Sequence, residues 1–147
     1  GGAIEFDGKD AKGIEIEIPI FTWTEKHAFS DARMTTAFRK NFEDTVGKVN
    51  LNPFRNHDQG EVKLLSISGG RDSKRAKWEL NFQFSRSRNR KEFYVGNIKI
   101  DEKRGWDYMW VSYHDKLEDG ELLRKPRAVY IECVYEYVDF SILGIGK

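Results

Sequence analysis

The segment KWELNFQFS, residues 77–85, constrains the fold more than any other part of the chain. Large apolar side chains alternate in it with polar ones, which is the period of a β-strand with one buried face. The apolar positions are Trp78, Leu80, Phe82 and Phe84. The apolar segment 61–68 precedes it, and the intervening GGRDSKRA is typical of a turn. We therefore expect the two segments to form a β-hairpin.

More strands are expected on both sides of this hairpin. An aromatic content of 14% favours a sheet over a helix bundle. The other strand-like segments are 13–23, 92–100 (interrupted at Gly96-Asn97), 105–115 and 127–140. The last is apolar on both faces, so it is expected to be a central strand, and 117–126 reads as a charged connection before it.

One helix is expected over residues 31–46. Asp31 is a candidate N-cap and Gly47 a candidate C-cap. Between them, four apolar residues recur every four positions and form a narrow stripe: Met34, Phe38, Phe42 and Val46. We expect this stripe to pack against one face of a sheet.

These elements predict an α+β fold, a mostly antiparallel sheet or sandwich of six to seven strands with one packed α-helix. The length of 147 residues fits one domain, taken as 13–147, after a flexible N-terminal segment, 1–12.

The strand over 13–23 changes its apolar face along its length. Ile14, Ile16, Ile18 and Ile20 share one face, whereas Phe21 and Trp23 occupy the other, beyond Pro19. This pattern is typical of a strand that crosses between layers or enters an interface. Phe21 and Trp23 are therefore candidate interface residues, together with the apolar C-terminal tail, which is expected to be exposed: Phe140, Ile142, Leu143 and Ile145.

The aromatic residues of 105–115 have two interpretations. Trp106, Tyr108 and Trp110 share one face of the expected strand, while Met109 and Val111 lie on the other. Cross-strand pairing with the row from Trp78 to Phe84 would make them core. The alternative is an exposed platform for a glycan or for the bases of nucleic acid.

The charges are unevenly distributed although their total is almost neutral, with 25 Lys and Arg against 24 Asp and Glu. Basic residues dominate between Arg71 and Lys91, and acidic residues dominate the first 32 positions. We expect Arg86, Arg88 and Arg90 to face acidic residues near Glu15 and Glu17 of a neighbouring copy. Nucleic acid is a less favoured partner.

No motif predicts an enzyme, a cofactor or a metal site. His27, His57 and His114 lie in separate segments without metal-ligand spacing, and no nucleophile motif is present. His57, Asp58 and Glu61 are the best remaining candidates for catalysis. Cys133 is the one cysteine of the chain and lies among apolar residues, where we expect a buried, inert thiol.

Three blocks of the sequence resemble small uncharacterised structural proteins of phage and prophage gene clusters. They are FRNHDQGEVKLLSISGGRDSKRAKWELNFQFSRSRN, RGWDYMWVSY and KPRAVYIECVYEYVDFSILGIG, within residues 50–146. The shared features are a glycine-rich hairpin, a W-x-x-x-F-x-F strand, a G-W-[DE]-Y-x-W-V block and a [DE]-F-S-x-L-G-[IV] tail. They are structural signatures, so no functional residue is carried over. The resemblance implies a virion component such as a tail, neck or tail-terminator subunit.

The expected function is therefore that of a non-enzymatic structural protein of a phage or phage-derived particle, acting by homo-oligomerisation. Its partners would be other copies of itself and other particle proteins, with no cofactor. No apolar run approaches the roughly 20 residues that span a bilayer, so no membrane partner is expected. The expected location is the cytoplasm before assembly and the virion afterwards. A β-rich module that binds nucleic acid or glycan is the alternative.

Overall fold

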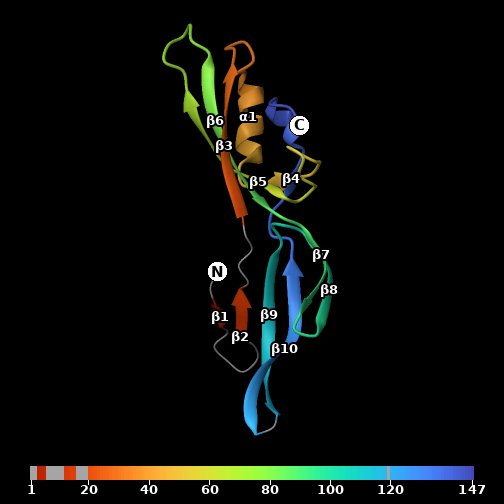
Figure 1. Ribbon diagram of the computed structural model, residues 1–147. Coiled ribbons are helices and arrows are strands. Elements are labelled where there is room, and N and C mark those ends of the chain that lie inside the picture. The colour runs from red at the N-terminus through yellow and green to blue at the C-terminus, as the bar shows by residue number, and fades with distance from the viewer. Residues whose placement is uncertain (1–2, 6–11, 16–19, 119) are drawn as a thin grey trace.

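A computed structural model describes residues 3–5, 12–15, 20–118 and 120–147. The molecule is elongated, with a five-stranded sheet at one end and a four-stranded sheet at the other (Figure 1). The described elements are β1 (Ala3–Glu5), β2 (Lys12–Glu15), β3 (Ile20–Phe29), α1 (Thr36–Thr45), β4 (Val49–Asn50), β5 (Val62–Gly70), β6 (Trp78–Ser87), β7 (Arg90–Val95), β8 (Ile98–Lys103), β9 (Tyr108–Glu118), β10 (Glu121–Glu132), β11 (Tyr137–Val138) and the 3-10 helix η1 (Phe140–Leu143).

The predicted α+β class is confirmed, with strands mostly antiparallel and one α-helix in the described part. The predicted number of six to seven strands is too low, because three of the expected strands divide and several strands have only two to four residues. Such short strands are too brief to show an alternating pattern. The predicted flexible segment 1–12 falls mostly outside the described residues.

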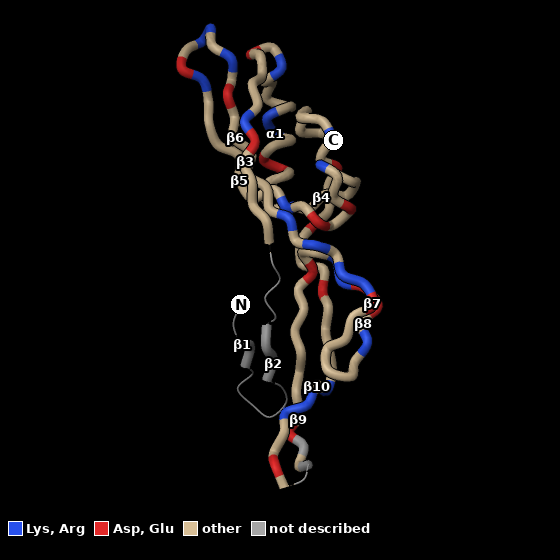
Figure 2. The backbone as a smooth tube through the Cα atoms, viewed as in Figure 1, with Lys and Arg blue, Asp and Glu red and all other residues tan. Residues whose placement is uncertain are grey.

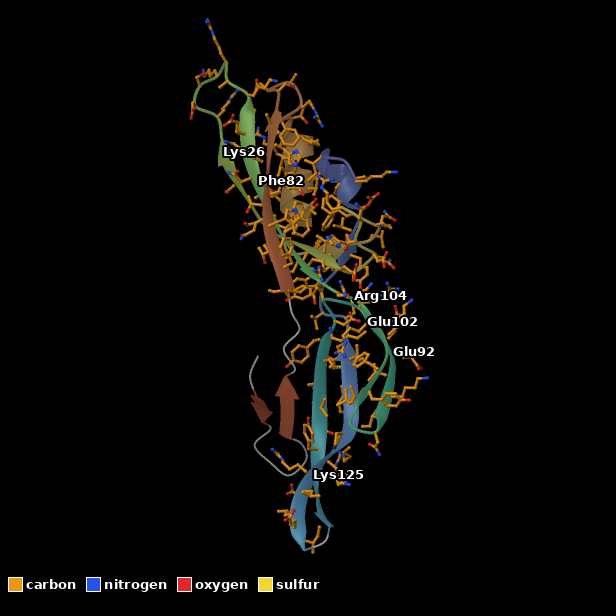
Figure 3. All side chains as sticks on the ribbon, in the orientation of Figure 1. Lys26, Phe82, Glu92, Glu102, Arg104 and Lys125 are labelled. Atoms are coloured by element: carbon orange, nitrogen blue, oxygen red, sulfur yellow. The ribbon has the colours of Figure 1, made fainter. Side chains whose placement is uncertain are left out.

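The five-stranded sheet has the order β11-β4-β5-β6-β3 and contains the main core. The hairpin predicted from 61–68 and 77–85 is confirmed as β5 and β6, which pair from Val62↔Arg86 to Gly70↔Glu79. Leu80, Phe82 and Phe84 are buried on one face of β6. Phe82 lies between the sheet and α1, with its ring 5.5 Å from that of Phe42 (Figure 3).

The helix α1 begins later than predicted. Its N-cap is Thr35, whose Oγ1 accepts a hydrogen bond from the Phe38 amide at 3.1 Å. Asp31, the expected N-cap, instead accepts hydrogen bonds from Arg71 and from the Trp78 indole. The prediction of Asp31 was wrong because these partners, distant in sequence, compete for its carboxylate.

No helix in the described residues is long and apolar enough to cross a membrane.

The four-stranded sheet has the order β1-β2-β9-β10. The expected central strand 127–140 is therefore wrong: β10 begins at Glu121, lies at the sheet edge and ends at Glu132. The expected loop 117–126 belongs to the β9–β10 hairpin, whose turn includes Gly120 at φ +79°. Residues 137–143 return to the five-stranded sheet as β11 and η1.

Two other expected strands also divide. The segment 13–23 contributes β2 to the four-stranded sheet and the start of β3 to the five-stranded sheet, which confirms that it crosses between layers. Residues 16–19 lie outside the described part. The segment 92–100 turns at Gly96-Asn97 to give the hairpin β7–β8. A Cβ on Gly96 would lie 2.7 Å from Cγ of Pro126, so this hairpin packs closely on β10.

The C-terminal tail is part of the core rather than an exposed surface. Phe140, Leu143 and Ile145 are 2%, 0% and 9% exposed, and Ile142 is half-buried. The Arg55 guanidinium holds the tail in place by donating to the carbonyl of Ile145 at 2.8 Å. The expectation of an exposed apolar tail was wrong, because a short apolar sequence after a loop does not reveal which surface it covers.

Candidate functional site: a basic groove, an open strand edge and a hairpin arm

A polar groove of about 870 Å³ lies where the two sheets meet. It is formed by the loop before β5, the end of β6 with the connection to β7, and the residue that follows β8. All of its lining residues are polar or charged: Asn56, His57, Asp58, Gln59, Glu61, Arg86, Arg88, Asn89, Lys91 and Arg104. Figure 2 shows Lys and Arg gathered along the β6–β7 connection at this junction. We call this feature the basic groove.

Glu61 is the structural centre of the basic groove. It is 8% exposed, and its two carboxylate oxygens accept hydrogen bonds from the amides of Asp58 and Asn89, each at 2.8 Å. Its carbonyl accepts from the Ser87 amide and from the Trp106 indole. The carboxylate therefore holds the loop before β5 against the β6–β7 connection.

Asn89 joins the same junction to β8 and β9. Its side chain accepts from the Gly105 amide at 2.7 Å and donates to the Gln59 carbonyl at 2.9 Å. A Cβ on Gly105 would lie 1.6 Å from the Ser87 carbonyl oxygen, so the backbones approach as closely as only glycine allows. These contacts fix three segments that are far apart in the sequence.

Four cationic side chains line the basic groove. Arg86, Arg88 and Lys91 form no ion pair with any described residue, and the Nε of Arg86 is buried without a hydrogen-bond partner. Arg104 donates to the Gln59 carbonyl, and its Nε lies 3.3 Å from Oε1 of Glu102. Figure 3 labels Arg104 and Glu102 close together. The groove therefore carries excess positive charge and is suited to an anion.

The buried side chain of Lys103 supports the backbone at Arg104, which is one of these four cations. Lys103 is 2% exposed, and its Nζ donates to the carbonyls of Arg104 and Gly105. Burial lowers the pKa of Lys103, and the nearby Asp107 opposes that effect. Its role is to hold the turn after β8 in place.

The three arginines expected to act together are separated by the structure. Arg86 and Arg88 line the basic groove, whereas Arg90 lies over the Phe93 ring, 3.9 Å from its centroid. Of the expected acidic partners, Glu15 belongs to β2 and Glu17 lies outside the described residues. The sequence analysis included Lys91 in the basic region but not among the interface candidates. It missed Arg104, because nothing in the sequence places Arg104 beside Lys91.

The free edge of β3 carries two exposed apolar side chains. In the described structure β3 pairs with β6 alone, from Ile20↔Ser87 to Phe29↔Trp78. Ile20 and Phe21 are 59% and 56% exposed. Trp23 is half-buried, stacks on Phe84 and donates its indole N–H to Glu25. Of the two aromatic interface candidates in this strand, Phe21 is thus the accessible one.

A two-stranded arm extends the four-stranded sheet at the end of the molecule opposite α1 (Figure 1). β2 pairs with β9 at residues 110–112. Beyond this point β10 is the one described strand that pairs with β9, as far as Glu118↔Glu121. Near the tip, Leu117 and Leu122 face each other across the ladder and are 70% and 68% exposed. We call residues 113–126 the hairpin arm. The sequence analysis missed it, although Asp-Gly at 119–120 is a recognised hairpin signal.

The expected pairing of the 105–115 aromatics with the Trp78–Phe84 row is wrong, because β9 and β6 belong to different sheets. The Trp106 indole donates to the Glu61 carbonyl, and its ring meets Tyr135 edge-on. Trp110 stacks on Tyr130, with centroids 4.2 Å apart, and Tyr108 is half-buried. Met109 and Val111 are the buried side of this strand. The three rings therefore do not form one exposed platform.

The structure also places the residues considered for metal binding and catalysis. Among the described residues, no group of three or more His, Cys, Asp or Glu could hold a metal ion. His57, Asp58 and Glu61 do come together at the basic groove, but the Glu61 carboxylate is used by two amides. Cys133 is exposed, contrary to expectation, because it follows the end of β10.

Comparisons of the chain with protein-family models, characterised proteins and solved structures find no match.

Proposed function

We propose that this chain is a non-enzymatic structural protein of a phage or phage-derived particle, of the tail, neck or tail-terminator type, that acts by self-association. The particle follows from the sequence resemblance. Self-association is supported chiefly by one observation: among the described residues, the hairpin arm exposes Leu117 and Leu122 next to its last ladder pair, Glu118↔Glu121.

An isolated two-stranded ribbon is at best marginally stable in water. Apolar side chains opposed across its tip add exposed hydrophobic surface, which marks contact sites in soluble proteins. Burying the two leucines against a neighbour would supply the covering layer that the arm lacks. The arm is therefore the part of the molecule best suited to reach another copy.

The matching surface is the open edge of β3 at Ile20 and Phe21. It is apolar and half-exposed, and no described strand pairs with it on one side. In Figure 1 it lies near the middle of the molecule, whereas the arm tip lies at one end, so the two surfaces cannot meet within one chain. Contact between two different surfaces gives a head-to-tail arrangement, which closes into a ring or continues as a filament.

The test compares the solution mass of the wild type with that of Leu117→Ser/Leu122→Ser by light scattering after size exclusion. The wild type is expected to form oligomers as concentration rises, and the variant to remain monomeric. Leu51→Ser/Val134→Ser removes two exposed apolar residues elsewhere, 42% and 54% exposed, and should assemble like the wild type. A wild type that stays monomeric at all concentrations, or an arm variant that assembles normally, would refute the proposal.

A further inference from the structure

The basic groove holds cations that the fold itself leaves without counter-charges. Its four cations outnumber its two carboxylates, which leaves the lining with a net charge of +2, and neither Asp58 nor Glu61 forms an ion pair with any described residue. Arg86, Arg88 and Lys91 are also unpaired in the part of the chain that the structure covers. A ligand that supplies negative charge would satisfy this arrangement.

The groove is built rather than incidental. The Arg86 Nε is buried and has no hydrogen-bond partner among the described residues, so this side chain is held within the fold. Arg86 is held in β6 between Phe21 of β3 and Val62 of β5. The opposite side is fixed by the Glu61 and Asn89 hydrogen bonds, so the cations project from a preorganised frame.

We propose that the basic groove binds the phosphodiester backbone of nucleic acid. Four cations distributed over about 870 Å³ exceed what one small anion needs and suit a chain of phosphates. Guanidinium groups bind phosphate oxygens in a bidentate manner, and Arg supplies three of the four cations. His57 is the one aromatic ring among the lining residues, so the contacts are to phosphates and carry no base preference.

An acidic surface of a second copy is the competing occupant. The sequence analysis expected such a surface to meet Arg86, Arg88 and Arg90 together, but Arg90 packs on Phe93 and leaves that set. The cations that remain come from two connections on either side of a groove, an arrangement that fits a narrow polyanion. Self-association through the hairpin arm uses an adjoining surface, because Phe21 of the β3 edge pairs with Arg86 of the groove.

The experiment measures binding of fluorescein-labelled oligothymidine, about 20 nucleotides long, by anisotropy over a series of salt concentrations. The wild type should bind with an affinity that falls steeply with salt. Arg88→Gln/Lys91→Gln should bind about tenfold more weakly at low salt and lower the slope of log K against log salt by about 1.4. Both residues are exposed, so this variant should fold normally.

Lys74→Gln/Arg75→Gln is the matched control, because it removes the same charge from the exposed turn between β5 and β6. It should bind like the wild type. A mixed-sequence strand should bind as well as oligothymidine, because the contacts are to phosphates. The proposal would be overturned by absent binding at low salt, by equal losses in the groove and control variants, or by displacement with millimolar inorganic phosphate. Equal binding of a poly-glutamate peptide, or loss of self-association in the groove variant, would assign the groove to an acidic protein surface instead.

Discussion

At the residue scale, Glu25 is the polar centre that ties the core of the five-stranded sheet to the C-terminal tail. Its carboxylate accepts hydrogen bonds from Arg55 at 2.7 and 3.0 Å and from the Trp23 indole at 2.8 Å, and it contacts His27 at 2.9 Å. Arg55 also donates to the Ile145 carbonyl. The tail is therefore held by a half-buried ion pair as well as by apolar packing.

This arrangement predicts a loss of stability in acid. Burial raises the pKa of Glu25, but hydrogen bonds from Arg55, Trp23 and His27 lower it by more, to about 2 from an ordinary 4.5. Because the folded pKa is the lower one, the stabilisation is complete above pH 4.5 and is lost as the pH falls towards 2. It amounts to roughly 3 kcal/mol. Urea unfolding at several pH values should show the midpoint falling through this window.

Glu25→Gln should remove most of that acid dependence and lower the free energy of unfolding at pH 7 by about 2–3 kcal/mol, since Arg55 loses its counter-charge. Glu43→Gln, in an exposed position of α1, should keep the wild-type pH profile. An unchanged profile for Glu25→Gln would show that the ion pair does not stabilise the fold.

Gly105 provides a second test at the residue scale. Gly105→Ala should destabilise the protein by at least about 2 kcal/mol, because the new Cβ would overlap the Ser87 carbonyl and force the junction apart. In Gly70→Ala the Cβ meets nothing within 4 Å, so little change is expected. Thermal unfolding of the two variants checks this, and similar melting temperatures would contradict the close approach.

At the element scale, the strands with strong alternation were predictable and the elements defined by distant partners were not. The alternation around Phe82 correctly identified the β5–β6 hairpin. The helix start was misplaced because two residues can serve as N-cap, and the choice depends on Arg71 and Trp78, which bind Asp31. β10 was predicted to be a central strand because it has apolar residues on both faces. Such a pattern indicates that both faces are covered, but it does not reveal whether another strand or the β7–β8 hairpin covers them.

The cap itself is testable. Thr35→Ala should cost about 1 kcal/mol, since the Phe38 amide loses its acceptor. Thr36→Ala, at the first residue of α1, removes a similar hydroxyl that makes no capping bond and should cost much less. Urea denaturation followed by circular dichroism distinguishes the two, and equal costs would show that the hydroxyl of Thr35 does not cap the helix.

At the scale of the whole molecule, the two sheets meet at a polar junction. The β3 edge adjoins this junction, because Phe21 pairs with Arg86, whereas the tip of the hairpin arm lies far from it. The basic groove combines residues 56–61, 86–91 and 104, which the fold brings together from three segments. Sequence periodicity reports on the faces of single elements, so it identified the arginine run but could not place Arg104 or Glu61 beside it. Predicting the groove would have required the register of β5, β6 and β8 at the same time.

The central claim is that copies associate head-to-tail, with the hairpin arm of one against the β3 edge of the next. Disulfide trapping tests it most directly, in a Cys133→Ser background that removes the exposed native thiol. Phe21→Cys and Leu122→Cys proteins are oxidised separately and as a mixture, and the products are separated by non-reducing electrophoresis. We expect a cross-linked dimer from the mixture and almost none from either protein alone. Dimers from Phe21→Cys alone would mean that two β3 edges pair with each other, and no dimer from the mixture would contradict the head-to-tail account.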